Sequence, residues 1–188
     1  MRHHTKKTTR KVLNVMNASL RNLLIVIGLA VGLVGCGGSV KRPDGATPTA
    51  ATGISKFSDV KLTLNDEAQK QLVDNLKFDL DQFGRTVRAK LTAAQLVDAA
   101  AAHTIGVTIT GVRVRGSFSA VMFGALAGAD SVDGDVNVLD KDGKVLRTFK
   151  VSASYAFGGF AGGIDSVRLN YLYEKFADLT AAELTGTK

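Results

Sequence analysis

Apolar residues recur with regular spacing through residues 53–188, and the spacing changes from one segment to the next. Residues 54–64 mix polar and β-branched apolar positions in the manner of a strand. Residues 66–83 carry apolar side chains every three or four positions, which predicts a helix capped by Asn65 and ended by Gly84. A strand followed by an amphipathic helix is therefore expected here.

The next segments predict short strands and a second helix. Residues 86–91 fit a short strand, and residues 93–102 fit an alanine-rich helix capped by Thr92. Residues 105–114 alternate as a strand whose phase shifts at Gly111, which predicts a β-bulge.

The last part of the chain predicts a hairpin and a final helix. Residues 132–139 and 145–156 are expected strands, joined by a turn in which Gly143 supplies a positive φ. A C-terminal amphipathic helix is expected from a stripe formed by Ile164, Val167, Tyr171, Leu172, the side-chain stem of Lys175, Phe176 and Leu179. The order of elements predicts an α+β fold, with an antiparallel sheet of about four to five strands and two to three helices packed on one face.

A leader precedes this domain. Residues 23–34 are an unbroken apolar run behind a basic segment, which is the layout of a secretory signal peptide. The run is shorter than the roughly 20 residues that a membrane-spanning helix needs. A start at Met16 instead of Met1 would shorten the leader without changing this prediction.

The formal charge of +7 belongs almost entirely to the leader. Six of the 24 Lys and Arg residues lie in residues 1–35, which contain no acid. The other 18 are nearly balanced in number by the 17 Asp and Glu residues. A nucleic-acid-binding protein would carry its excess of bases on the folded part. We therefore expect no nucleic-acid partner.

The only cysteine follows the apolar run directly, in the sequence Leu33, Val34, Gly35, Cys36. This sequence resembles the lipobox of bacterial lipoproteins. The resemblance implies that the chain is cleaved before Cys36 and that Cys36 carries acyl chains such as palmitate. Gly37 stands where an Asp would retain the protein at the inner membrane, which implies a periplasm-facing anchor in the outer membrane.

Residues 37–52 hold both prolines and show no apolar period, so they predict a flexible tether. The expected organisation is a signal peptide at residues 1–35, an acylated cysteine and tether at 36–52, and a periplasmic α+β domain at 53–188.

Two motifs in the domain are shared with a known family. Residues 124–128 are a glycine and alanine run, and residues 136–146 read Val-x-Val-x-Asp-x-x-Gly-Lys-Val-Leu. With the later Gly-Gly break and final helix, this pattern resembles a family of Gram-negative lipoproteins described as a domain of unknown function, of the 4410 type. The resemblance covers about residues 54–184, and its motifs are turn and strand residues rather than catalytic ones.

Five aspartates lie close together in the sequence: Asp130, Asp133, Asp135, Asp140 and Asp142. A calcium loop starting at Asp140 would need a Glu at its twelfth position, which is Val151. We therefore interpret these residues as turn carboxylates that cap the backbone and keep a hairpin edge soluble, and expect neither a metal nor a cofactor.

Two other features bear on chemistry. The loop at residues 158–163 lacks the Lys-Ser/Thr ending of a P-loop, and Asp165 behind it would repel phosphate, so a chain crossing or a flap is expected instead. His103 is the only histidine outside the leader and is expected at a helix end, where an imidazolium complements the helix dipole. An enzyme is therefore not expected, and a periplasmic hydrolase using His103 stays the minor alternative.

Residues 116–129 are small, apolar and uncharged. The favoured interpretation is a loop folded under the sheet as part of the core, and the alternatives are membrane contact or self-association. The candidate interaction loops contain Gly124, Gly128, Gly158, Gly159, Gly162 and Gly163.

Three functional hypotheses follow. The first is an outer-membrane lipoprotein that acts as a non-catalytic binding or accessory module with an envelope partner. The second is a subunit of an oligomeric secretion or pore-like assembly, and the third is a hydrolase.

Overall fold

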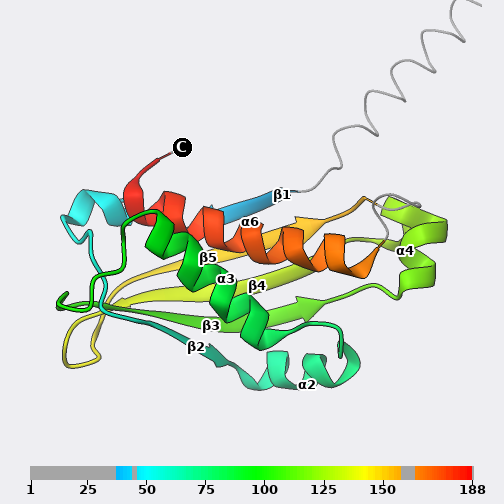
Figure 1. The fold of residues 1–188 in the computed structure, drawn as a ribbon, viewed down its shortest axis with the longest axis horizontal. Helices are drawn as coiled ribbons and strands as arrows, with labels where there is room; N and C mark the ends of the chain where they lie inside the picture. Colours follow the sequence, from blue (N-terminus) through cyan, green and yellow to red (C-terminus); the bar gives the residue numbers. More distant parts are fainter. Residues whose placement is uncertain (1–36, 44–45, 158–163, 188) are drawn as a thin grey trace, which may run out of the picture. The chain divides into compact units, whose positions relative to one another are not determined.

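The computed structural model describes residues 37–43, 46–157 and 164–187, and the lipobox lies outside them. In chain order the elements are β1 (Gly37–Lys41), the 3₁₀ helix η1 (Thr49–Thr52), β2 (Val60–Leu64), α2 (Asp66–Asp74), α3 (Leu80–Ala93), β3 (Thr104–Arg113), α4 (Ser117–Phe123), the 3₁₀ helix η2 (Gly124–Ala127), β4 (Asp130–Leu139), β5 (Val145–Tyr155) and α6 (Asp165–Thr185) (Figure 1). Within the described residues, none of the helices has the length and apolarity needed to cross a bilayer.

The five strands form one sheet in the order β1-β5-β4-β3-β2. The predicted α+β class is confirmed, but the sheet is mixed rather than antiparallel, because β2 and β3 run parallel. Helices α2 and α3 lie between these two strands in the sequence, and a crossover through helices returns the chain in the same direction. The described residues contain four α-helices, where two to three were predicted.

Helices α3 and α6 cover one face of the sheet (Figure 1). Residues of β4 alternate strictly between buried and half-buried, so every second side chain enters the core beneath these helices. Between the two helices, rings of Phe83, Tyr173 and Phe176 pack with centroids 5.1 to 5.6 Å apart. The core therefore lies between the sheet and the α3–α6 layer.

The helical region between β2 and β3 differs from the prediction. Asn75 ends α2, and Asp79 caps a new helix by accepting a hydrogen bond from the Gln82 amide at 2.8 Å. Helix α3 continues through Gly84 because Phe83, Val87 and Leu91 recur every four residues and are buried.

Two further element predictions for residues 86–102 are wrong, and the strand predicted at residues 54–64 is confirmed only in part. The residues of the predicted strand at 86–91 lie in α3, and the predicted helix at 93–102 does not form, because the chain is irregular beyond Ala93, the last residue of α3. Of the predicted strand at 54–64, only Val60–Leu64 pairs in the sheet.

Several local predictions are confirmed. The side chain of Asn65 caps α2, the register of β3 against β4 shifts between Ile109 and Gly111, and Gly143 closes the β4–β5 turn with a φ of 80°. The C-terminal helix forms as α6. Its buried stripe is rotated from the predicted one, because Ile164 and Val167 are exposed.

The segment predicted to be a flexible tether is part of the fold. Strand β1 pairs antiparallel with β5, from Gly37 opposite Ser154 to Lys41 opposite Lys150. A Cβ atom on Gly38 would lie 2.5 Å from Leu179 Cδ1 and 2.6 Å from the Ser152 carbonyl oxygen. Glycine is thus required there by close packing, and not by chain flexibility.

We expect Gly38→Ala to weaken the docking of β1, because the added methyl group overlaps the backbone of β5 and the side chain of Leu179. The loss is expected to be about 1–3 kcal/mol of unfolding free energy, with faster hydrogen exchange in β1 and β5. Ser39→Ala is the matched control. Equal exchange rates in the two variants would contradict the packing argument.

Candidate functional site

Several chain segments meet at one end of the sheet. Gly37 pairs with Ser154, Tyr155 pairs with Asp130, and Ser131 pairs with Arg113. Helix α4 follows β3 at this end (Figure 1). We call this region, where β1 and β4 begin and β3 and β5 end, the α4 end.

A buried ionic cluster lies behind the surface of the α4 end. Arg168 Nη1 donates to both carboxylate oxygens of Asp130 at 2.7 Å, and Arg115 Nη2 donates to Asp130 Oδ2 at 3.0 Å. Asp130 and Arg168 are fully buried, and Arg115 is 5% exposed. One carboxylate therefore holds two guanidinium groups away from water.

Backbone carbonyl groups complete the surroundings of Arg115. Its guanidinium donates to the carbonyl oxygens of Gly128, Tyr155 and Phe157 at 2.9, 3.1 and 2.9 Å. Arg168 Nη2 donates in turn to the Arg115 carbonyl oxygen at 3.1 Å. Because these oxygens carry partial negative charge, they compensate the second cation and tie the ends of β3, β4 and β5 to α6.

Asp165 extends the cluster towards the surface. Its carboxylate accepts hydrogen bonds from Arg168, Lys77 and Ser117. Burial raises the pKa of Asp165, but the hydrogen bonds from Lys77, Arg168 and Ser117 outweigh burial and hold the pKa below its usual value. The ionised carboxylate links α6, α4 and the connection between α2 and α3.

Large apolar side chains are exposed over this polar cluster. Six of them, each more than half exposed, come from α4, η2, the residues after β5 and those before α6: Phe118, Met122, Phe123, Leu126, Phe157 and Ile164. The prediction that residues 116–129 fold under the sheet as core is therefore wrong. The segment forms α4 and η2 instead, with only Ala120 of α4 buried.

The candidate glycine loops are only partly described. Gly124 begins η2. Gly128 has a φ of 83°, and a Cβ atom added there would lie 2.5 Å from Arg113 Nη1. Gly158, Gly159, Gly162 and Gly163 lie outside the described residues, as do Leu33, Val34, Gly35 and Cys36.

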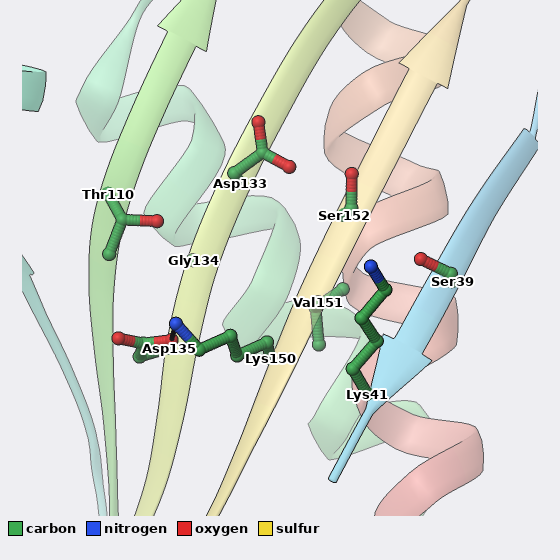
Figure 2. Close-up of a pocket in the computed structure, with 9 residues that line it drawn as sticks. All are labelled: Ser39, Lys41, Thr110, Asp133, Gly134, Asp135, Lys150, Val151 and Ser152. Carbon is green, nitrogen blue, oxygen red and sulfur yellow. Dashed lines mark ion pairs between the residues drawn. The ribbon is translucent and has the colours of Figure 1, made fainter. Parts of the chain in front are cut away.

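The sheet face opposite α3 and α6 is polar. A hollow of about 200 Å³ lies on this face. Figure 2 shows Ser39 and Lys41 of β1 beside Asp133 and Asp135 of β4 and Lys150 and Ser152 of β5. Lys150 Nζ lies 3.6 Å from Asp135 Oδ1. This polar face carries charges of both signs.

Four of the five aspartates fall into three different roles. Asp140 caps the hairpin turn as predicted, accepting from the amides of Asp142 and Lys144 at 2.9 Å. Asp130 is not a turn carboxylate, because it is the buried centre of the ionic cluster, while Asp133 and Asp135 line the polar face. Among the described residues, no group of three potential ligands is placed to hold a metal ion.

His103 lies just before β3 rather than at a helix end. Its carbonyl oxygen accepts hydrogen bonds from the amide and hydroxyl of Ser58, at 2.7 and 3.0 Å. These backbone contacts of His103 position the start of β3.

A second ionic contact docks the N-terminal segment on α6. Glu183 is 4% exposed, pairs with Arg42, and accepts from the Thr49 amide at 3.1 Å. Burial raises the pKa of Glu183, but the bonds from Arg42 and Thr49 outweigh burial, so the pKa lies below its ordinary value of 4.5.

The buried charges were missed by the sequence reasoning, although a signal was present. Arg168 lies four residues before Leu172 and Glu183 lies seven after Phe176, so both occupy the buried stripe of α6. A charge at such an inward helical position requires a buried partner. The sequence alone does not say which acid or base provides it.

Most of the folded unit matches a known protein family. A family model described as a domain of unknown function (DUF4410) matches residues 46–159. The chain belongs to this family. The match confirms the resemblance seen in residues 136–146, and the DUF4410 region includes Arg115 and Asp130 but ends before Arg168.

Three solved structures resemble the DUF4410 chain. A point variant of the PelC dodecamer from Paraburkholderia phytofirmans is 14% identical with a TM-score of 0.40, and a PelC dodecamer from the same organism is 12% identical with a TM-score of 0.39; in each case 76% of this chain and 97% of the other are covered. A minor lipoprotein from Acinetobacter baumannii is 10% identical with a TM-score of 0.38, covering 69% of this chain and 94% of the other. The sequence has no significant match among curated proteins.

Asp130→Asn should destabilise the domain strongly, because it removes the buried negative charge that Arg115 and Arg168 share. We expect a loss of about 3–5 kcal/mol of unfolding free energy, measured by urea denaturation. Asp133→Asn, three positions along β4 on the polar face, should change stability by less than about 0.5 kcal/mol. Similar losses in the two variants would contradict a special role for Asp130.

The docking of Glu183 should depend on pH. Because the folded-state pKa of Glu183 is lowered, its contribution is present above the unfolded value of 4.5 and is lost as pH falls through the folded value. Glu183→Gln should cost about 1 kcal/mol at pH 7, and the difference from wild type should shrink below about pH 4.5.

Urea titrations at a series of pH values measure this difference. Glu174→Gln, an exposed position on the same helix, is the control and should track wild type throughout. A wild-type advantage over Glu183→Gln that stays constant down to pH 3 would exclude the ionised carboxylate as its source.

Proposed function

We propose that this protein is an outer-membrane lipoprotein, acylated on Cys36, whose periplasmic domain is a non-catalytic binding or accessory module of the cell envelope. The observation that carries the proposal is the position of the domain boundary. The compact unit spans Cys36–Lys188, so it starts at the cysteine of the lipobox.

Cleavage before Cys36 would leave this unit whole. Gly37, the next residue, already belongs to β1 and pairs with Ser154. Each CH₂ of a buried acyl chain contributes about 0.8 kcal/mol, and more than one chain makes anchoring durable. With no tether between the cysteine and the sheet, the domain would be held directly at the membrane surface.

The polar face is the surface we assign to a periplasmic partner. Lys41 and Lys150 lie beside Asp133 and Asp135 around an open hollow, which suits a polar protein surface carrying both charges (Figure 2). The buried carboxylates of the described residues, Asp130 and Glu183, are committed to structure, since Asp130 binds two arginines and Glu183 binds Arg42. This use of the charged groups favours binding over catalysis.

An oligomeric assembly is the second candidate, favoured by the edge of the sheet. Strand β1 lies at one edge of the sheet, so its outer side offers backbone groups to another strand. The mass of the detergent-extracted protein tests this candidate, because a ring or other multimer would support it and a monomer would exclude it.

Metabolic labelling with palmitate tests the anchor. We expect the wild-type chain to be labelled and to fractionate with outer membranes, and Cys36→Ala to be unlabelled, because it lacks the only thiol in the sequence. Affinity capture of the acylated form, after crosslinking in intact cells, would then identify the envelope partner.

The matched control is the charge-reversed Lys150→Glu variant, which keeps Cys36 but changes the polar face. It should be labelled like wild type and should recover less of the crosslinked partner. A purified wild-type protein that retains Met1, or whose mass shows an unmodified Cys36, would overturn the proposal.

A further inference from the structure

The exposed apolar residues of the α4 end form one surface. Phe118, Met122, Phe123 and Leu126 lie on one continuous segment, Phe157 lies two residues after the end of β5, and Ile164 directly precedes α6. Rings of Phe118 and Phe123 are in contact, with centroids 6.3 Å apart. A gathering of large apolar side chains at one end of a domain marks a contact surface.

The charges around this surface do not oppose lipid. Residues 116–129 contain no charged side chain. Asp165, at the start of α6, is paired with Lys77 and Arg168. Lys77 is about half exposed and can meet the phosphates of a lipid surface while its stem lies along apolar side chains.

The attachment point of the chain lies at the same end. Gly37 pairs with Ser154, one residue before Tyr155, whose ring is 6.0 Å from that of Phe157. Cys36 is bonded to Gly37, so their Cα atoms are about 3.8 Å apart. A lipid on Cys36 would therefore enter the bilayer beside the exposed apolar residues.

We propose that the α4 end is a membrane-contact surface, with Phe118, Met122, Phe123, Leu126, Phe157 and Ile164 lying in the interface of the bilayer that receives the acyl chains. This proposal rests on the proposed acylation of Cys36. Because that cysteine is within one residue of the sheet, the bilayer is the surface nearest to these side chains.

The same geometry sets the orientation of the domain. Strand β5 ends at the α4 end, and Val145 lies nine positions before Ser154, which corresponds to about 30 Å. The β4–β5 turn is then the part farthest from the membrane, and the strands stand away from the bilayer plane. The polar face is left open to the periplasm at the side.

A fluorescent probe on a single introduced thiol can test this contact in the acylated full chain. Acylation consumes the sulfur of Cys36, so Met122→Cys provides the only free thiol for an environment-sensitive dye. Val145→Cys is the matched control, because the two side chains are similarly exposed, 61% for Met122 and 51% for Val145. Met122 lies in α4, at the α4 end, whereas Val145 begins β5 at the opposite end of the sheet. The labelled proteins are reconstituted in vesicles whose lipids carry quenchers at shallow acyl carbons.

We expect the probe at position 122 to be quenched at least about twofold by these lipids, because interfacial side chains insert roughly 5–10 Å. The probe at 145 should be quenched only by an aqueous quencher. A probe at 122 that responds like the one at 145 would overturn the membrane contact. Protection of position 122 from both quenchers would also overturn it, in favour of a second copy or another protein.

Two further readouts separate this proposal from the anchor itself. Flotation with vesicles and palmitate labelling report acylation, whereas quenching at position 122 reports contact. A chain that is labelled with palmitate and floats with vesicles, but whose probe is not quenched, would overturn the contact surface alone. A chain without the palmitate label would overturn both the anchor and the contact surface. Urea denaturation of both thiol variants confirms that each is folded.

Discussion

The buried contact of Asp130 with Arg115 and Arg168 is the constraint on which the α4 end depends. Two buried cations are compensated by the carboxylate and by the carbonyl oxygens of Gly128, Tyr155 and Phe157. These partners come from segments far apart in the sequence, so they can satisfy one another only when the sheet and α6 are both in place. The cluster therefore gives the end of the sheet one defined geometry, and the exposed apolar residues are held on that base.

Sequence patterns predicted the parts of the fold that are determined locally. The cap at Asn65, the bulge at Gly111 and the turn at Gly143 each depend on one residue type at one position. Residues 86–91 fit a short strand by their pattern, but Val87 and Leu91 are buried in the core on one face of helix α3. The parallel pairing of β2 and β3 is likewise a tertiary result.

The candidate site was less accessible to sequence reasoning. The lipobox is a contiguous motif and was visible, although the described residues begin just after it. Gly38 lies in a segment whose composition predicts a flexible linker. The sequence does not show that the side chain of Leu179 and the carbonyl oxygen of Ser152 pack against this glycine in the fold. Asp130 looked like one aspartate among five, and only the fold brings it to Arg115 and Arg168.

The pairing of β1 with β5 imposes an order on assembly. Gly37 and Ser154 are neighbours in the sheet but are 117 positions apart in the chain, and the N-terminal partner is synthesised first. Until β5 is made, β1 has no strand to pair with, and the flank of β5 stays open for as long as β1 is detached. Completion of the sheet is thus a late event in folding, because it waits for a contact of large sequence separation.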